Sequence, residues 1–147
     1  MGRIKADHKR FMAANEFMVV RECKKAGEIA VREANSRQQF RVRTGNLRRN
    51  TKAQLLVLAD GRKVRVSNKL DYASYLEFGT DPHVIRAKKA KALRFMYPQF
   101  SGNYVYRKQV MHPGTKAYKW LWTGVHHSYI FLRVRLLNDM RDLARQF

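Results

Sequence analysis

The chain is organised around residues 71–115, which read DYASYLEFGTDPHVIRAKKAKALRFMYPQFSGNYVYRKQVMHPGT. Two basic runs in this stretch, 85–97 and 104–111, are typical of strands, and Ser101-Gly102-Asn103 lies between them as a turn. The pattern predicts an antiparallel β-hairpin that extends from the body of the protein and carries a strong positive charge. We expect such a hairpin to be held against another surface.

Two further elements are predicted before this hairpin. Residues 72–78 predict a short amphipathic helix, which Gly79 ends. Residues 52–67 predict a second hairpin, in which Asp60-Gly61 is the dipeptide of a type I′ turn. The valines of its return strand alternate with charged and polar residues, which predicts one buried face and one wet face.

Helical periodicity predicts a long helix toward each end of the chain, at about 6–34 and about 120–146. The first has a stripe of small and apolar residues, and the second a strongly amphipathic one. The first stripe consists of Met12, Val19, Cys23, Ala26, Ala30 and Ala34, and the second of Leu121, Val125, Tyr129, Leu132, Leu136, Met140, Leu143 and Phe147. The order of elements predicts a single α+β domain over 1–147, with an antiparallel β-sheet packed by two long helices and an extended basic β-hairpin.

The net charge of +20 and the pI of about 10.8 lie far outside the usual range for a domain of 147 residues. No acidic residue stands between Asp81 and Asp139, and a second interval without acids separates Glu33 from Asp60. A protein with this charge repels itself, so a partner must neutralise it. Nucleic acid, an anionic membrane and acidic protein neighbours all have the required chemistry.

The sequence contains no pattern that indicates catalysis. The histidines lack metal-ligand spacing, and Cys23 falls on the apolar stripe of a helix, as a small buried hydrophobe does. Glu77, Asp81 and His83 are the best candidates for a hydrolytic or nuclease site. We interpret Glu77 instead as the partner of a nearby Arg or Lys, and Asp81 as a turn residue before proline. We therefore expect no enzyme, no metal site and no cofactor.

Membrane attachment and disulfide cross-linking are also not expected. No apolar run approaches the roughly 20 residues that a membrane span needs. Cys23 is the one cysteine, so the chain cannot form an intrachain disulfide.

Two sets of residues are candidates for contacts with partners. The first belongs to the short helix and the basic hairpin, and we expect it to form the subunit or partner interface. The second belongs to the basic segment before residue 50, and we expect it to contact DNA in a channel or an acidic partner. The first set is Tyr75, Leu76, Glu77, Phe78, Arg86, Lys88, Lys89, Lys91, Arg94, Arg107 and Lys108, and the second is Arg41, Arg43, Arg48 and Arg49.

Three segments carry a resemblance to a known family. TGNLRRN (44–50), DYASYLEFGTDPHVIRAKKAKALRF (71–95) and HPGTKAYKWL (112–121), in this order and spacing, resemble the small head–tail junction proteins of tailed bacteriophages. The departures are Ala87, where proline is common, and 118–120, where a Gln-Pro-Phe-like segment is usual. The resemblance implies a virion structural protein of the neck or upper tail, with a fold similar to small α+β tail-terminator and connector proteins that assemble as rings.

These observations lead to one functional hypothesis and two alternatives. We expect a homo-oligomeric ring, a hexamer or a dodecamer, in the head-to-tail connector, at a neck, tail-completion or tail-terminator position. It would be assembled in the host cytoplasm and would join portal, adaptor or head-closure proteins to tail-tube proteins around double-stranded DNA. The alternatives are a non-specific basic nucleic-acid-binding protein acting outside any particle, and a metal-dependent nuclease that needs Glu77.

Overall fold

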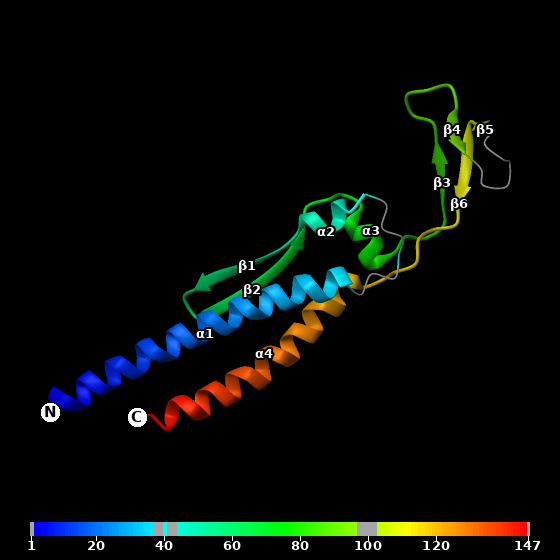
Figure 1. Cartoon of the computed structure of the whole chain (residues 1–147). Coiled ribbons are helices and arrows are strands. Elements are labelled where there is room, and N and C mark those ends of the chain that lie inside the picture. The colour runs from blue at the N-terminus through cyan, green and yellow to red at the C-terminus, as the bar shows by residue number, and fades with distance from the viewer. Residues whose placement is uncertain (1, 37–39, 41–43, 97–102, 147) are drawn as a thin grey trace.

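The computed structural model describes residues 2–36, 40, 44–96 and 103–146. Figure 1 shows α1 and α4 side by side, β1 and β2 along α1, and strands β3 to β6 in an arm that projects from this body. In chain order the elements are α1 Gly2–Ser36, α2 Asn46–Asn50, β1 Thr51–Leu58, β2 Gly61–Asn68, α3 Ala73–Phe78, β3 His83–Arg86, β4 Leu93–Met96, β5 Tyr104–Arg107, β6 Gln109–His112 and α4 Trp120–Ala144.

The two long helices pack through small residues. Ala30 and Ala34 of α1 and Gly124 and Ser128 of α4 are all buried. A Cβ atom added to Gly124 would lie 2.5 Å from the carbonyl oxygen of Ala30 and 2.8 Å from the Cβ of Ala34. The helices therefore approach so closely at this point that only glycine fits.

The predicted stripes are correct for the middle of α1 and partly wrong elsewhere. Cys23 and the alanines of the α1 stripe are buried, whereas Met12 is exposed and Val19 only half-buried. In α4, Val125, Tyr129 and Met140 are exposed, together with other large apolar residues. Periodicity identifies an apolar face, but it does not say whether the same chain covers that face. Phe147 lies outside the described residues.

The α+β class with antiparallel pairing is confirmed, and the structure divides the strands among separate ribbons. Among the described residues the strands form three separate two-stranded antiparallel ribbons, β1–β2, β3–β6 and β4–β5. The β1–β2 ribbon lies against α1, and α4 packs mainly on α1. The strands of the arm cannot join that ribbon because the chain between them passes through α3 and then leaves the body (Figure 1).

The turn between β1 and β2 also differs from the prediction. Leu58 pairs with Gly61, so the two-residue loop is Ala59-Asp60, one position earlier than expected. Neither loop residue has a positive φ; among the described residues, Lys119 is the one non-glycine residue that does. A type I′ turn requires positive φ at both loop positions, so it is excluded here.

The arm contains both predicted basic runs, and the pairing between them is interrupted. Val84 pairs with Met111 in β3–β6, and Arg94 pairs with Tyr106 in β4–β5. Between the two ribbons, residues 87–92 on one side stand opposite Lys108 alone on the other. The predicted tip at 101–102 lies outside the described residues, and Asn103 immediately precedes β5.

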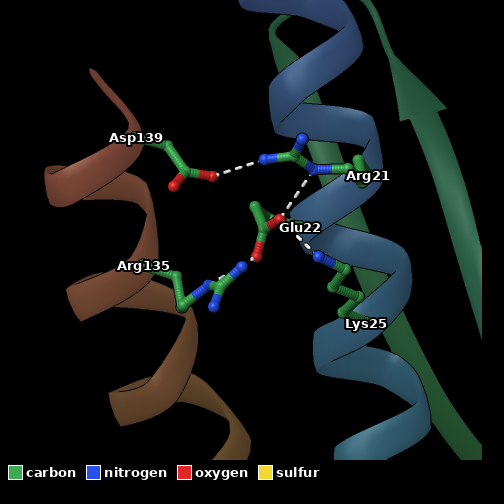
Figure 2. A network of polar contacts seen from close by, with 5 residues as sticks. All are labelled: Arg21, Glu22, Lys25, Arg135 and Asp139. Atoms are coloured by element: carbon green, nitrogen blue, oxygen red, sulfur yellow. Dashed lines mark hydrogen bonds and ion pairs between the residues drawn. The ribbon is translucent and has the colours of Figure 1, made fainter. Parts of the chain in front are cut away.

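A buried carboxylate joins the two long helices (Figure 2). Glu22 in α1 is 1% exposed, and its carboxylate accepts hydrogen bonds from Arg21 (2.8 Å), Lys25 (3.1 Å) and Arg135 of α4 (3.2 Å). Arg21 also donates to Asp139 of α4 at 2.7 Å. Burial raises the pKa of Glu22, but the hydrogen bonds from Lys25, Arg21 and Arg135 outweigh it and hold the pKa below its ordinary value.

Replacement of Gly124 by alanine should separate the helices. The added Cβ meets backbone atoms of α1 that cannot rotate away, so Gly124→Ala should lower the free energy of unfolding by about 1–3 kcal/mol. Denaturant unfolding measures this change. Asn138→Ala, at an exposed position of the same helix, is the matched control and should be nearly neutral; equal stability of both variants would contradict the close approach.

Acid should weaken the contact between α1 and α4. The pKa of Glu22 in the folded protein lies below its ordinary value of 4.5. The contribution of this carboxylate to the free energy of unfolding is therefore fully present above pH 4.5, and it is lost as the pH falls through the folded pKa. Glu22→Gln should cost about 1.5–3 kcal/mol at neutral pH and flatten the acid-induced loss of stability. Unfolding measured across the acid range tests this, with the exposed Glu28→Gln as control; a variant that keeps the full acid dependence would refute it.

Candidate assembly interface

The three family-like segments meet in one small core. Leu47 of α2, Ala73 of α3 and Trp120 of α4 are buried together with Ala34 of α1. Half-buried hydrophobic residues pack around this cluster, namely Phe40, Leu70, Leu76 and Leu121. Each of the segments 44–50, 71–95 and 112–121 thus contributes a core side chain, so the spacing of the motifs reflects the packing of four helices at one point.

Glu77 forms the cap of α4. One carboxylate oxygen accepts the backbone N–H of Leu121 at 2.8 Å, and the other accepts that of Trp122 at 2.9 Å. The carbonyl oxygen of Glu77 accepts the N–H of Lys119 at 3.2 Å. A carboxylate at this position satisfies otherwise unpaired donors and interacts favourably with the helix dipole. The predicted pairing of Glu77 with an Arg or Lys is therefore wrong.

The sequence held an indirect sign of this cap. The residue at the N-cap position of α4 is Lys119, which has a left-handed backbone and makes no side-chain capping bond. A helix without Ser, Thr, Asp or Asn at its start needs an acceptor from elsewhere in the chain. Local sequence indicates the missing cap, but it does not identify the acceptor, which lies 44 residues before Leu121.

Two glycines hold the base of the arm. Thr80 and Thr115 form an isolated antiparallel bridge, in which each backbone N–H donates to the other residue's carbonyl oxygen, with N···O distances of 2.9 and 3.0 Å. Gly79 and Gly114 flank the bridge with φ of 77° and 89°. A Cβ on Gly79 would lie 2.6 Å from the Thr115 carbonyl oxygen, and one on Gly114 would lie 2.3 Å from that of Thr80. The FGT and PGT triplets therefore cross at a point that only glycine permits, and this crossing determines where the arm leaves the body.

The four interface candidates on α3 separate into two pairs. Tyr75 and Phe78 are exposed, Phe78 by 80%. Leu76 packs against the core and Glu77 is buried as the helix cap, so neither is available for contact with a partner in this structure. A six-residue helix presents one face to solvent and one to the body, which accounts for the division.

An apolar groove lies between α3 and α4. Its volume is about 390 Å³, and its walls include Phe78, Leu121, Trp122 and Val125. Trp122 is 58% exposed there. The outer surface of α4 continues this apolar character through exposed Tyr129, Ile130, Val134, Leu137 and Met140. A helix that is apolar on both faces is normally covered on both, and within the described residues α1 covers one.

The cations of the arm are exposed and unpaired. None of the seven predicted arm residues comes within ion-pair distance of a carboxylate among the described residues. Arg94 lies over the Tyr104 ring, 3.7 Å from its centroid. The seven are Arg86, Lys88, Lys89, Lys91, Arg94, Arg107 and Lys108, so the arm gathers the first basic set into one projecting element.

The second basic set lies on a different element. Arg48 and Arg49 are exposed on α2, and Arg49 donates to the carbonyl oxygen of Thr44 at 3.0 Å. Arg41 and Arg43 lie outside the described residues. Two of the four members are therefore placed, and they belong to the body of the protein and not to the arm (Figure 1).

The candidate catalytic residues are engaged in structural contacts. Both carboxylate oxygens of Glu77 accept backbone N–H groups, and Nδ1 of His83 lies 2.8 Å from the Asp81 carbonyl oxygen. Burial raises the pKa of the Cys23 thiol, which disfavours the thiolate. Among the residues that the structure describes, no three His, Cys, Asp or Glu side chains are grouped to hold a metal ion. None of the described helices has the length and hydropathy of a membrane span.

Loss of the cap should destabilise the junction of α3 and α4. Glu77→Ala leaves two N–H groups of α4 without an acceptor and should lower the free energy of unfolding by about 1–2 kcal/mol. Glu77→Gln keeps one acceptor oxygen and should lose less. Denaturant unfolding ranks the variants against Asp81→Ala, an exposed carboxylate at the base of the arm. Unchanged stability together with loss of a metal-dependent DNA cleavage would instead support the nuclease alternative.

Comparison with known proteins identifies one family. The family described as "Bacteriophage HK97-gp10, putative tail-component" matches residues 5–79, just over half of the 147 residues. The matched segment covers most of α1 and all of α2, β1, β2 and α3, and it ends at Gly79, where the arm begins. Searches of curated proteins and of solved structures gave no match.

Proposed function

The chain belongs to the HK97-gp10-like family of bacteriophage tail components, and from this premise we propose that it is a ring-forming subunit of the head-to-tail connector. The family assignment agrees with the predicted resemblance to small head–tail junction proteins and supports a structural role in the virion. A neck, tail-completion or tail-terminator position is the finer part of the proposal. We also propose that the role is structural and not enzymatic.

The uncovered apolar surface carries this proposal. Phe78, Trp122 and Val125 line an open groove, and the outer face of α4 extends it. Groups of exposed large apolar residues often mark interfaces on soluble proteins. Exposed aromatic residues are also the side chains that dominate binding energy at interfaces. A neighbouring copy of the chain that covers this groove would bury them.

The arm gives a second reason for an assembly. Isolated two-stranded ribbons are at best marginally stable in water, and β3–β6 and β4–β5 are both two-stranded. Val84 and Met111 pair across β3–β6, and both are exposed. Docking of this apolar pair on a neighbouring subunit would stabilise the arm.

The position of these surfaces favours a ring. The groove lies between α3 and α4, and the arm projects from the far side of the Thr80–Thr115 bridge (Figure 1). Contact between two different surfaces of identical subunits is heterologous, and such contacts close into rings when the rotation allows. We propose a hexamer or a dodecamer that stacks between portal, adaptor or head-closure proteins and tail-tube proteins.

Polar substitutions in the groove should block assembly without unfolding the chain. Phe78→Ser combined with Trp122→Ser removes two exposed aromatic residues, and each is expected to contribute about 2 kcal/mol to subunit contacts. The double variant should remain monomeric in sedimentation velocity at concentrations where the wild type forms rings. Its thermal unfolding should resemble that of wild-type monomer.

The matched control is Val57→Ser, which removes an exposed apolar residue near the tip of the β1–β2 ribbon. This variant should assemble as the wild type does. A wild-type protein that stays monomeric, together with virions that join heads to tails without it, would refute the proposal. DNA binding by a monomer that never assembles would favour the nucleic-acid-binding alternative.

A further inference from the structure

The loop at residues 87–92, which we name the lysine loop, has the chemistry of a DNA contact. It reads AKKAKA, and its three lysines, Lys88, Lys89 and Lys91, are exposed. We propose that this loop binds the phosphate backbone of double-stranded DNA. The inference rests on the proposed connector function, in which DNA passes the subunit, and it assigns one element of the arm to that DNA.

The lysine loop interrupts the pairing between the strands of the arm. The ladder stops at the pair Arg86–Gln109 and resumes at Leu93–Arg107, so the loop and Lys108 fill the space between the two ribbons. The N–H of Ala87 donates to the Lys108 carbonyl oxygen at 3.2 Å, which anchors the start of the loop. Figure 1 shows the connection between β3 and β4 at the end of the arm that is far from the helices.

The body of the protein offers little charge to neutralise this loop. Glu22 is buried among three cations, and Glu77 caps α4. Other carboxylates pair locally, as Glu16 does with Arg62 and Asp142 with Arg145. Six of the eleven acidic residues are engaged within their own chain, and the net charge is +20, so a second copy is a poor electrostatic partner for the lysine loop. The partner must bring its own negative charge.

The composition of the lysine loop favours phosphate over an acidic protein surface. Alanine is its single apolar residue type, and it contains no aromatic residue and no arginine. Protein interfaces are depleted in lysine, and their binding energy comes mainly from aromatic residues and arginine. Lysine binds phosphate as a point charge without demanding a fixed geometry. A loop of lysines on small spacers therefore suits a regular row of phosphates, which it contacts without reading the base sequence.

The proposed ring would multiply a weak contact. Each subunit presents three lysines in the loop and four more cations beside it, Arg86, Arg94, Arg107 and Lys108. Repeated around a channel, such contacts act together even though each is weak. Because they are electrostatic and carry no sequence information, they hold DNA without fixing its register.

The salt dependence of DNA binding tests the inference. The full chain with Lys88, Lys89 and Lys91 replaced by glutamine is compared with wild type, using a mixed-sequence duplex over a range of salt. The slope of log affinity against log salt should fall by about 0.9 for each lysine that contacts a phosphate. The control replaces three exposed lysines of the body, Lys52, Lys63 and Lys69, by glutamine. It has the same net charge as the loop variant and should keep the wild-type slope.

Sedimentation of the same samples separates this inference from the proposed function. If the loop variant forms rings normally and its DNA affinity depends on salt with the wild-type slope, the DNA contact is overturned and the connector proposal stays intact. Loss of rings in the loop variant alone would make the loop a subunit interface and also overturn it. Equally tight binding of poly-glutamate at matched charge would assign the loop to an acidic protein instead. A reduced slope confined to the loop variant, with its rings preserved, supports the inference.

Discussion

The N-terminus of α4 needs an acceptor for its backbone N–H groups, and the rest of the architecture depends on how that need is met. Glu77 supplies both acceptor oxygens from α3, so the start of the last helix is tied to the end of the short one. The chain between these two elements must then leave and return through one narrow point. Gly79 and Gly114 make this crossing possible because any side chain there would collide with the opposite backbone. The arm is a consequence of this geometry.

The same arrangement leaves one side of α4 without a partner. Small residues bring α4 close to α1, and the Glu22 network joins the two helices further along. These contacts cover one side of α4, while Trp122, Tyr129 and Met140 remain exposed. Internal packing therefore uses one face of this helix and leaves the other open. An open face of this kind is consistent with the proposed assembly.

Charge follows a similar division. Six of the eleven carboxylates are engaged within the subunit, as a helix cap, in the Glu22 network or in local ion pairs. Seven exposed cations without a carboxylate partner among the described residues lie on the arm, and further exposed lysines such as Lys52 and Lys69 lie on the body. A chain with a net charge of +20 gains little from further internal neutralisation, because it has only 11 acidic residues. The excess charge is available for partners, and the arm is where it projects furthest.

Local sequence was sufficient for the α+β class, for both long helices and for the two segments that pair in the arm. These features depend on periodicity, on glycine and on strand-forming runs, which act over a few residues. The family resemblance was also readable, because its motifs mark the core around Leu47, Ala73 and Trp120. Local sequence did not separate the exposed residues of α3 from the buried ones, since Leu76 and Glu77 turn inward while Tyr75 and Phe78 face solvent.

The tertiary structure alone decided which apolar face of α4 is covered, that the strands form separate ribbons, and that Glu77 is a cap and not a salt-bridge partner. Each of these depends on groups far apart in the chain. An apolar stripe on a helix has the same period whether its own chain or another chain covers it. Likewise, a glutamate in the sequence looks the same whether its carboxylate binds a guanidinium group or the N–H groups at a helix end. Periodicity and residue type are properties of the chain, whereas the partner is chosen by packing in three dimensions.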